Sequence, residues 1–177
     1  MSVFRKLRRL TPVPLALLIA GCALFAEPPP PAPERSARPS YDLVAAIRAA
    51  GEREQSIISV NPLRDPAVTA LQDGAQADER AGRYAEAAAK LDQALTLSPD
   101  SPDLLQDRAE IAVRLRDFSR AEKLAHQSWS LGPKLGPLCA RNWQTIVEMR
   151  LQAGDSAGAA SARKWVLTCH KAGVNRY

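Results

Sequence analysis

The sequence predicts an all-α fold, a short solenoid of about three helix-turn-helix units preceded by an N-terminal capping helix. The first observation is the stretch 83–100, where small and large apolar residues recur at helical spacing on one face. The second is its punctuation, because Gly82 permits a tight turn before the helix and Pro99 stops it. The third is that the whole pattern returns 34 residues further along the chain.

The recurrence defines the repeat. Equivalent positions carry similar residues: Tyr84 and Phe118, Ala87 and Ala121, Leu97 and Leu131, Pro99 and Pro133, and in the preceding helix Leu71 and Leu105, Ala75 and Ala109. A 34-residue helix-turn-helix unit is typical of tetratricopeptide repeats, and the chain resembles that family over residues 65–169. The resemblance implies antiparallel helix pairs stacked side by side, with a concave groove lined by the first helix of each pair.

Each unit also has a recognisable beginning. Asp65-Pro66 and Ser101-Pro102 each place a capping residue before a proline at the first helical position. The third unit matches at an offset of 38 after a four-residue insertion, with Trp143 where the family often has tryptophan. Terminal repeats are commonly atypical, so we interpret it as a degenerate repeat. In the first unit, Gly74 and Asp78 stand where the family usually has larger apolar or aromatic residues, which suggests a loosely packed first helix.

A further helix is expected over 41–60, with Ser40 as its cap and an end before Asn61-Pro62. Leu43, Ile47 and Ala50 share one face of it. Because the open ends of a solenoid must be covered, we expect this face to pack on the first repeat as an N-terminal cap. The alternative is a mobile amphipathic segment that folds on a partner.

The first residues resemble a bacterial lipoprotein signal peptide. Four basic residues precede the short apolar run 14–21, which is followed by Cys22. The sequence Ile19-Ala20-Gly21-Cys22 resembles the lipobox, which implies removal of 1–21 and lipidation of Cys22, and Ala23 is compatible with the outer membrane. The alternatives are an ordinary signal with a chance cysteine, or a short N-terminal anchor helix.

Processing would change the charge. Residues 1–21 hold four basic and no acidic side chains, so the formal charge would fall from +5 to +1, which gives no electrostatic case for nucleic-acid binding. Residues 22–40 are rich in proline and predict an extended spacer, reaching on the order of 55 Å from residue 23 to residue 40. The spacer would lift the domain off a lipid surface, and 170–177 would form a C-terminal tail.

The remaining cysteines, Cys139 and Cys169, fall at adjacent ends of the helix pair of the third unit. In an oxidising compartment an even pair so placed predicts a disulfide. By loop entropy, closing about thirty residues would stabilise the fold by roughly 3.5–4 kcal/mol. The alternative is two small buried thiols.

No catalytic constellation is found, so we expect neither an enzyme nor a metal or other cofactor. Neither histidine, His126 or His170, lies at metal-ligand spacing, and there is no glycine-rich phosphate loop. Instead, the resemblance places a partner-binding groove on Gln72, Gln76, Glu79, Gln106, Glu110, Val113, Arg114, Gln144, Glu148 and Leu151. The chaperone-binding subfamily clamps a peptide carboxylate with lysine, asparagine and arginine at such positions. Here glutamine and glutamate replace them, so that activity is not expected. The alternative is a solvated surface without a dedicated partner.

These resemblances imply a lipoprotein anchored in the outer membrane and facing the periplasm. Its tetratricopeptide groove would bind an envelope protein as an adaptor or scaffold. Similar proteins act as adaptors for cell-wall enzymes or for outer-membrane protein assembly. The alternative functions are a structural spacer and an assembly factor like the pilotins of secretins.

Overall fold

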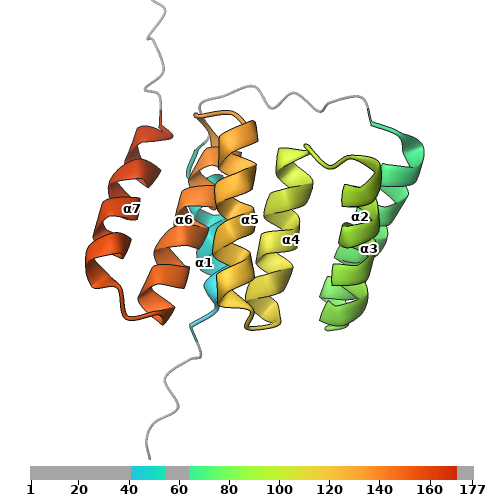
Figure 1. The fold of residues 1–177 in the computed structure, drawn as a ribbon, viewed down its shortest axis with the longest axis horizontal. Coiled ribbons are helices and arrows are strands. Elements are labelled where there is room, and N and C mark those ends of the chain that lie inside the picture. Colours follow the sequence, from blue (N-terminus) through green and yellow to red (C-terminus); the bar gives the residue numbers. More distant parts are fainter. Residues whose placement is uncertain (1–40, 55–63, 171–177) are drawn as a thin grey trace, which may run out of the picture. The chain divides into compact units, whose positions relative to one another are not determined.

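Seven helices and no strand make up the described part of the chain, residues 41–54 and 64–170 of a computed structural model (Figure 1). The helices are α1 (Leu43–Glu52), α2 (Pro66–Arg80), α3 (Tyr84–Leu97), α4 (Pro102–Arg114), α5 (Phe118–Leu131), α6 (Pro137–Gln152) and α7 (Ser156–Thr168). None of these helices is long and apolar enough to cross a membrane. The expected signal peptide, Cys22, the proline-rich spacer and residues 171–177 lie outside the described residues.

From α2 onward the helices form three antiparallel pairs, α2 with α3, α4 with α5 and α6 with α7, and each pair packs on the next (Figure 1). This arrangement confirms the predicted all-α solenoid of three repeats. Its register is visible in the second helix of each pair, where Ala87, Ala121 and Ala159 are each 0% exposed. Alanines at these points let two helices approach closely, as the repeat pattern predicted.

The turns repeat as well. The side chains of Asp65, Asp117 and Asp155 accept hydrogen bonds from backbone N–H groups in the first turns of α2, α5 and α7. The turn inside each pair contains one residue with positive φ, namely Gly82 (75°), Arg116 (61°) and Gly154 (76°). Glycine adopts this left-handed conformation freely and arginine does not, so the second turn carries strain that the other two lack.

The expectation of a loosely packed first helix is wrong. Asp78 is buried and pairs with Arg83 at 2.6 Å and with Lys90 of α3. A Cβ added to Gly74 would lie only 3.1 Å from Cδ of Lys90. The lysine stem therefore fills the space at Gly74, and its ammonium neutralises Asp78.

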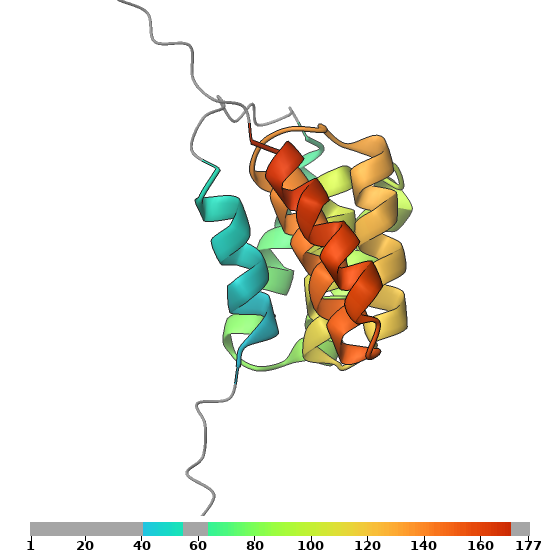
Figure 2. The same ribbon diagram turned by 90° about the vertical axis from the view of Figure 1, so that its left-hand side faces the viewer.

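Helix α1 is also not where the sequence predicted. It does not cap the first repeat; its main contacts are with α6 and, to a lesser extent, with α4. In Figure 2, α1 lies on one side of the solenoid and α5 on the other. Its N-cap is Asp42 rather than Ser40, with the Asp42 carboxylate accepting a bond from the N–H of Ala45. The helix ends at Glu52, and residues 55–60 of the expected helix lie outside the described residues.

Candidate interaction groove

The face lined by the first helices of the repeats, α2, α4 and α6, is the expected binding groove, and α1 lies on it. The predicted lining residues divide into three groups by exposure. The buried group consists of Gln106, Glu110, Val113 and Glu148. The half-buried group consists of Gln72, Glu79, Arg114 and Gln144, and the exposed group of Gln76 and Leu151. An open groove at the buried positions is therefore not what the structure shows, because α1 and neighbouring side chains cover them.

The apolar side of α1 is fully engaged. Val44 and Ile47 are at most 1% exposed and pack with Val113 of α4 and Met149 of α6. One turn further on, Ala50 joins the core cluster that contains Trp143 and Ile146 of α6. Fully burying a valine or isoleucine side chain contributes about 1.5–3 kcal/mol. The apolar stripe of α1 is thus a substantial part of the core.

Gly51 sets how closely α1 approaches α6. A Cβ at this position would lie 2.8 Å from Cγ of Arg141 and 3.1 Å from the carbonyl oxygen of Pro137. The second of these neighbours is backbone at the start of α6 and cannot easily shift. Glycine destabilises a helix interior by about 1 kcal/mol relative to alanine. At Gly51 this loss of helix stability accompanies the close approach of α1 to α6, which a larger residue would prevent.

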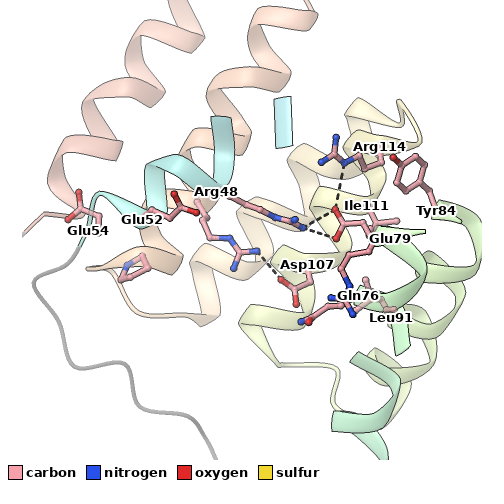
Figure 3. Close-up of a pocket in the computed structure, with 15 residues that line it drawn as sticks. Arg48, Glu52, Glu54, Gln76, Glu79, Tyr84, Leu91, Asp107, Ile111 and Arg114 are labelled. Atoms are coloured by element: carbon pink, nitrogen blue, oxygen red, sulfur yellow. Dashed lines mark hydrogen bonds and ion pairs between the residues drawn. The ribbon is translucent and has the colours of Figure 1, made fainter. Parts of the chain in front are cut away.

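Arg48 of α1 reaches into a cluster of charges contributed by three helices. Its guanidinium lies 2.8 Å from Glu79 of α2 and 2.7 Å from Glu110 of α4. Glu110, which is 0% exposed, also lies 2.7 Å from Arg141 of α6, and Arg141 lies 2.9 Å from Asp107. We call Arg48, Glu79, Asp107, Glu110 and Arg141 the groove charge cluster, part of which is seen in Figure 3.

The pKa values of the two arginines in the cluster favour their charged forms. Burial by itself would lower the pKa of Arg141, but the carboxylates of Glu110 and Asp107 raise it above its ordinary value. The pKa of Arg48 is raised in the same way, since Glu110 and Glu79 outweigh its burial. Both arginines are therefore permanent cations here, and the carboxylates are the groups that hold α1 by charge.

The two ends of α1 are fixed by polar contacts. At the start, the Tyr41 hydroxyl donates to Glu148 of α6 at 2.9 Å, and Arg114 of α4 donates to both carboxylate oxygens of Asp42 at 2.9 Å. Burial and then the Glu148 carboxylate raise the pKa of Tyr41, which keeps its proton available for this bond. Beyond the helix, Glu54 lies 2.9 Å from His170, just after α7.

A cleft of about 750 Å³ remains beside α1. It lies between the second half of α1 and helices α2 and α4, and Gln76, Tyr84 and Ile111 are among its lining residues (Figure 3). Four arginines and four carboxylates line it, so it has no dominant charge.

Cys139 and Cys169 form a disulfide, with their Cα atoms 5.6 Å apart, as the sequence predicted. Cys139 lies in the first turn of α6, and Cys169 is the C-cap of α7. The N–H of Gly136 also donates to the carbonyl of Cys169 at 2.8 Å. The last repeat is thereby closed at one end.

Within residues 41–54 and 64–170, no group of three or more histidine, cysteine, aspartate or glutamate side chains could hold a metal ion. His126 lies 3.7 Å from Glu122 and its ring contacts Trp143 edge-on, with the ring centroids 5.8 Å apart. His170 pairs with Glu54.

Sequence reasoning missed the residues that fill the groove, chiefly Tyr41, Arg48 and Gly51, and it missed the ion pair between Asp107 and Arg141. One signal was present. Arg48 is four residues after Val44 and next to Ile47, so a cation stands beside the apolar stripe of a short helix. A charge in that place needs a carboxylate on whatever surface the stripe covers.

Comparison with known proteins places the fold. The tetratricopeptide repeat family matches residues 80–134. The globular C-terminal domain of P. aeruginosa LpoP is 32% identical, with a TM-score of 0.56, over 59% of this chain and 99% of that chain. The first TPR of Spaghetti (RPAP3), bound to HSP90 peptide SRMEEVD, is 19% identical over 60% of this chain and 84% of its own, with a TM-score of 0.54. The Sgt2 TPR domain from Aspergillus fumigatus is 21% identical over 65% of this chain and 76% of its own, with a TM-score of 0.56.

No curated protein matches the chain in sequence. The two more distant structures support the fold alone, whereas the LpoP domain is matched over nearly its whole length at higher identity. The three stacked helix pairs, the 34-residue period and these similarities agree. The chain belongs to the same family as the globular C-terminal domain of P. aeruginosa LpoP, and its stacked helix pairs are tetratricopeptide repeats.

Proposed function

We propose that this protein is a lipoprotein anchored in the outer membrane, whose tetratricopeptide domain binds another envelope protein in the periplasm as an adaptor. The observation that carries the adaptor role is the solenoid itself. Stacked helix pairs with a concave face form an extended surface suited to protein recognition, and the described domain resembles that of LpoP over nearly all of the latter's length.

Two features support the compartment. The sequence around Cys22 has the form of a lipobox after a charged and then apolar segment. The disulfide between Cys139 and Cys169 is a bond that persists in oxidising compartments such as the periplasm. Neither feature depends on the groove, so the compartment and the adaptor role are tested separately.

The compartment is tested on the mature N-terminus. Mass spectrometry of protein from membranes should find an acylated Cys22 as the first residue, and Cys22→Ala should release the protein from the outer-membrane fraction. A mature chain that begins elsewhere, or that retains Met1, would contradict the anchor.

The adaptor role is tested by capture of partners from solubilised membranes. Gln76→Arg changes the exposed groove position of α2, and Ser119→Arg makes a similar change at an exposed position of α5 outside the groove. We expect Gln76→Arg to lose captured proteins that the wild type and Ser119→Arg retain. If groove changes are silent while shortening residues 27–40 abolishes function in cells, the protein is a spacer instead.

A further inference from the structure

Helix α1 occupies the face that a solenoid of this family presents to other proteins. Its ten residues are fewer than the roughly 12–15 that an isolated helix needs to be even marginally stable in water. The helical form of α1 therefore depends on its contacts with α4 and α6. A short amphipathic helix lying in a groove is one of the recurring ways in which proteins bind peptides.

The contacts of α1 define what the groove accepts. Apolar side chains at positions i and i+3, Val44 and Ile47, enter between α4 and α6. Gly51, at i+7, permits the close approach to α6. Arg48, at i+4, lies between the carboxylates of Glu79 and Glu110.

The positive charge of Arg48 on α1 is complementary to the negative charges of Glu79 and Glu110 in the groove. Glu110 is fully buried and faces two arginines, one from α1 and one from α6. Removing α1 would leave Glu79 without its Arg48 partner and would uncover Val113 and Met149. A groove of this kind favours a helix with a cation at the position of Arg48 and, where Arg114 holds Asp42, an anion at its start.

We propose that α1 is a ligand held in cis, and that the external ligand of the groove is an amphipathic helix of a partner protein that carries this same pattern and displaces α1. This inference rests on the proposed adaptor function and names the chemistry of the ligand. The displaced helix leaves as a unit, because its apolar stripe, Gly51 and Arg48 all face the same surface.

Because α1 belongs to the same chain as the groove, we can predict how strongly it competes with a free peptide for that groove. A helix joined to its site by a short stretch of the same chain acts at an effective concentration on the order of 1 mM. A free peptide with identical contacts at about 10 µM would therefore occupy roughly 1% of the grooves of the wild-type chain. Once α1 is released, the same peptide should bind at least about tenfold more tightly.

The test uses a fluorescent peptide of residues 41–54 and the full chain. Ile47→Asp puts a charge on the buried side of α1, whereas Ala45→Asp puts the same charge on its exposed side. We expect fluorescence anisotropy to show at least tenfold tighter peptide binding by Ile47→Asp than by Ala45→Asp or the wild type. A peptide carrying Arg48→Glu should lose at least tenfold in affinity for Ile47→Asp.

Gly51→Leu provides a second way to release α1, since it keeps Ile47 and Arg48 but cannot fit against Pro137. If both variants melt cooperatively and neither gains peptide binding, the inference is overturned. Loss of a cooperative melt in both also overturns it, because a solenoid that needs α1 to fold cannot exchange it. A wild-type dimer that Ile47→Asp converts to a monomer would place α1 in a second copy and would overturn the cis arrangement.

The peptide measurement is independent of the envelope and of any particular partner. Failure to bind the peptide would refute the helix-exchange inference and leave the capture of an envelope protein through Gln76 intact. Failure to capture any protein would refute the adaptor proposal even if the peptide bound.

Discussion

Replacing Glu110 with glutamine tests the groove charge cluster. Glu110 is 0% exposed and accepts hydrogen bonds from Arg48 at 2.7 Å, from Arg141 at 2.8 Å and from Gln106 at 3.0 Å. Glutamine has nearly the same shape but carries no charge, so two arginines would lose a shared carboxylate. Removing one partner of a buried ion pair typically costs about 3–5 kcal/mol.

The lower end of that range applies here. The side chains of Arg48 and Arg141 are 42% and 24% exposed, and each keeps a second carboxylate, Glu79 and Asp107 respectively. We therefore expect Glu110→Gln to lower the free energy of unfolding by about 3 kcal/mol, which for a domain of this size lowers Tm by about 10 °C.

Circular dichroism melts under oxidising conditions would measure this change. The matched control is Glu122→Gln, because Glu122 pairs with Arg150 at 3.0 Å but is 27% exposed, and such a pair contributes about 0–1 kcal/mol. A Glu110→Gln melt within about 2 °C of the control would refute the reasoning. The double variant Glu110→Met and Arg141→Met should lose less stability than the two single losses added together, since it leaves fewer unpaired charges.

Three further predictions concern the repeats. Arg116→Gly should raise stability by about 1 kcal/mol by relieving the positive φ of that turn, whereas Arg116→Ala should not, and urea melts would separate the two. Reducing the Cys139–Cys169 disulfide should cost about 3.5–4 kcal/mol, and hydrogen exchange should rise first in α6 and α7; equal exchange in oxidised and reduced protein would contradict this. The hydrogen bond from Lys90, and next that from Arg83, lower the pKa of Asp78 below its usual 3.8, so its ionised form stabilises the fold above that pH. The stability lost in Asp78→Asn should therefore be constant at neutral pH and shrink as the pH falls from about 4 towards 2, and a loss independent of pH would exclude this role.

The repeated part of the fold could be predicted from sequence because its determinants are local. Ala87 and Ala121 mark the same helix contact at one period, and Asp65 marks a helix start; all three lie where the pattern placed them. A period of 34 residues links each such position to an equivalent one, so one correct assignment fixes the others. The disulfide followed from the same register.

What the sequence did not predict depends on contacts between distant segments. The apolar face of α1 shows that it must be covered, but it does not show which surface covers it. Asp78 seemed to be a departure that loosens the first helix, yet Lys90, twelve residues away and on another helix, neutralises it. In both cases a charged side chain on or beside an apolar face was the sign of a long-range partner.

The polar lining of the groove follows from the same reasoning. Glutamate and glutamine occupy positions where the chaperone-binding subfamily uses cations to hold a carboxylate, and the sequence alone left open whether such a lining has any partner. In the structure two of these residues, Glu79 and Glu110, form ion pairs with the guanidinium of Arg48. A third, Glu148, accepts a hydrogen bond from the hydroxyl of Tyr41. At the position of Arg48 the groove therefore has the opposite polarity to a carboxylate clamp, because Glu79 and Glu110 are anions and Arg48 is the cation that they hold. A partner that enters this groove must place a cation at the position of Arg48, or else leave Glu79 and Glu110 without the charge that Arg48 supplies. Arg141 alone would then face the buried Glu110, which is why a helix with a cation at this position is the ligand that this surface selects.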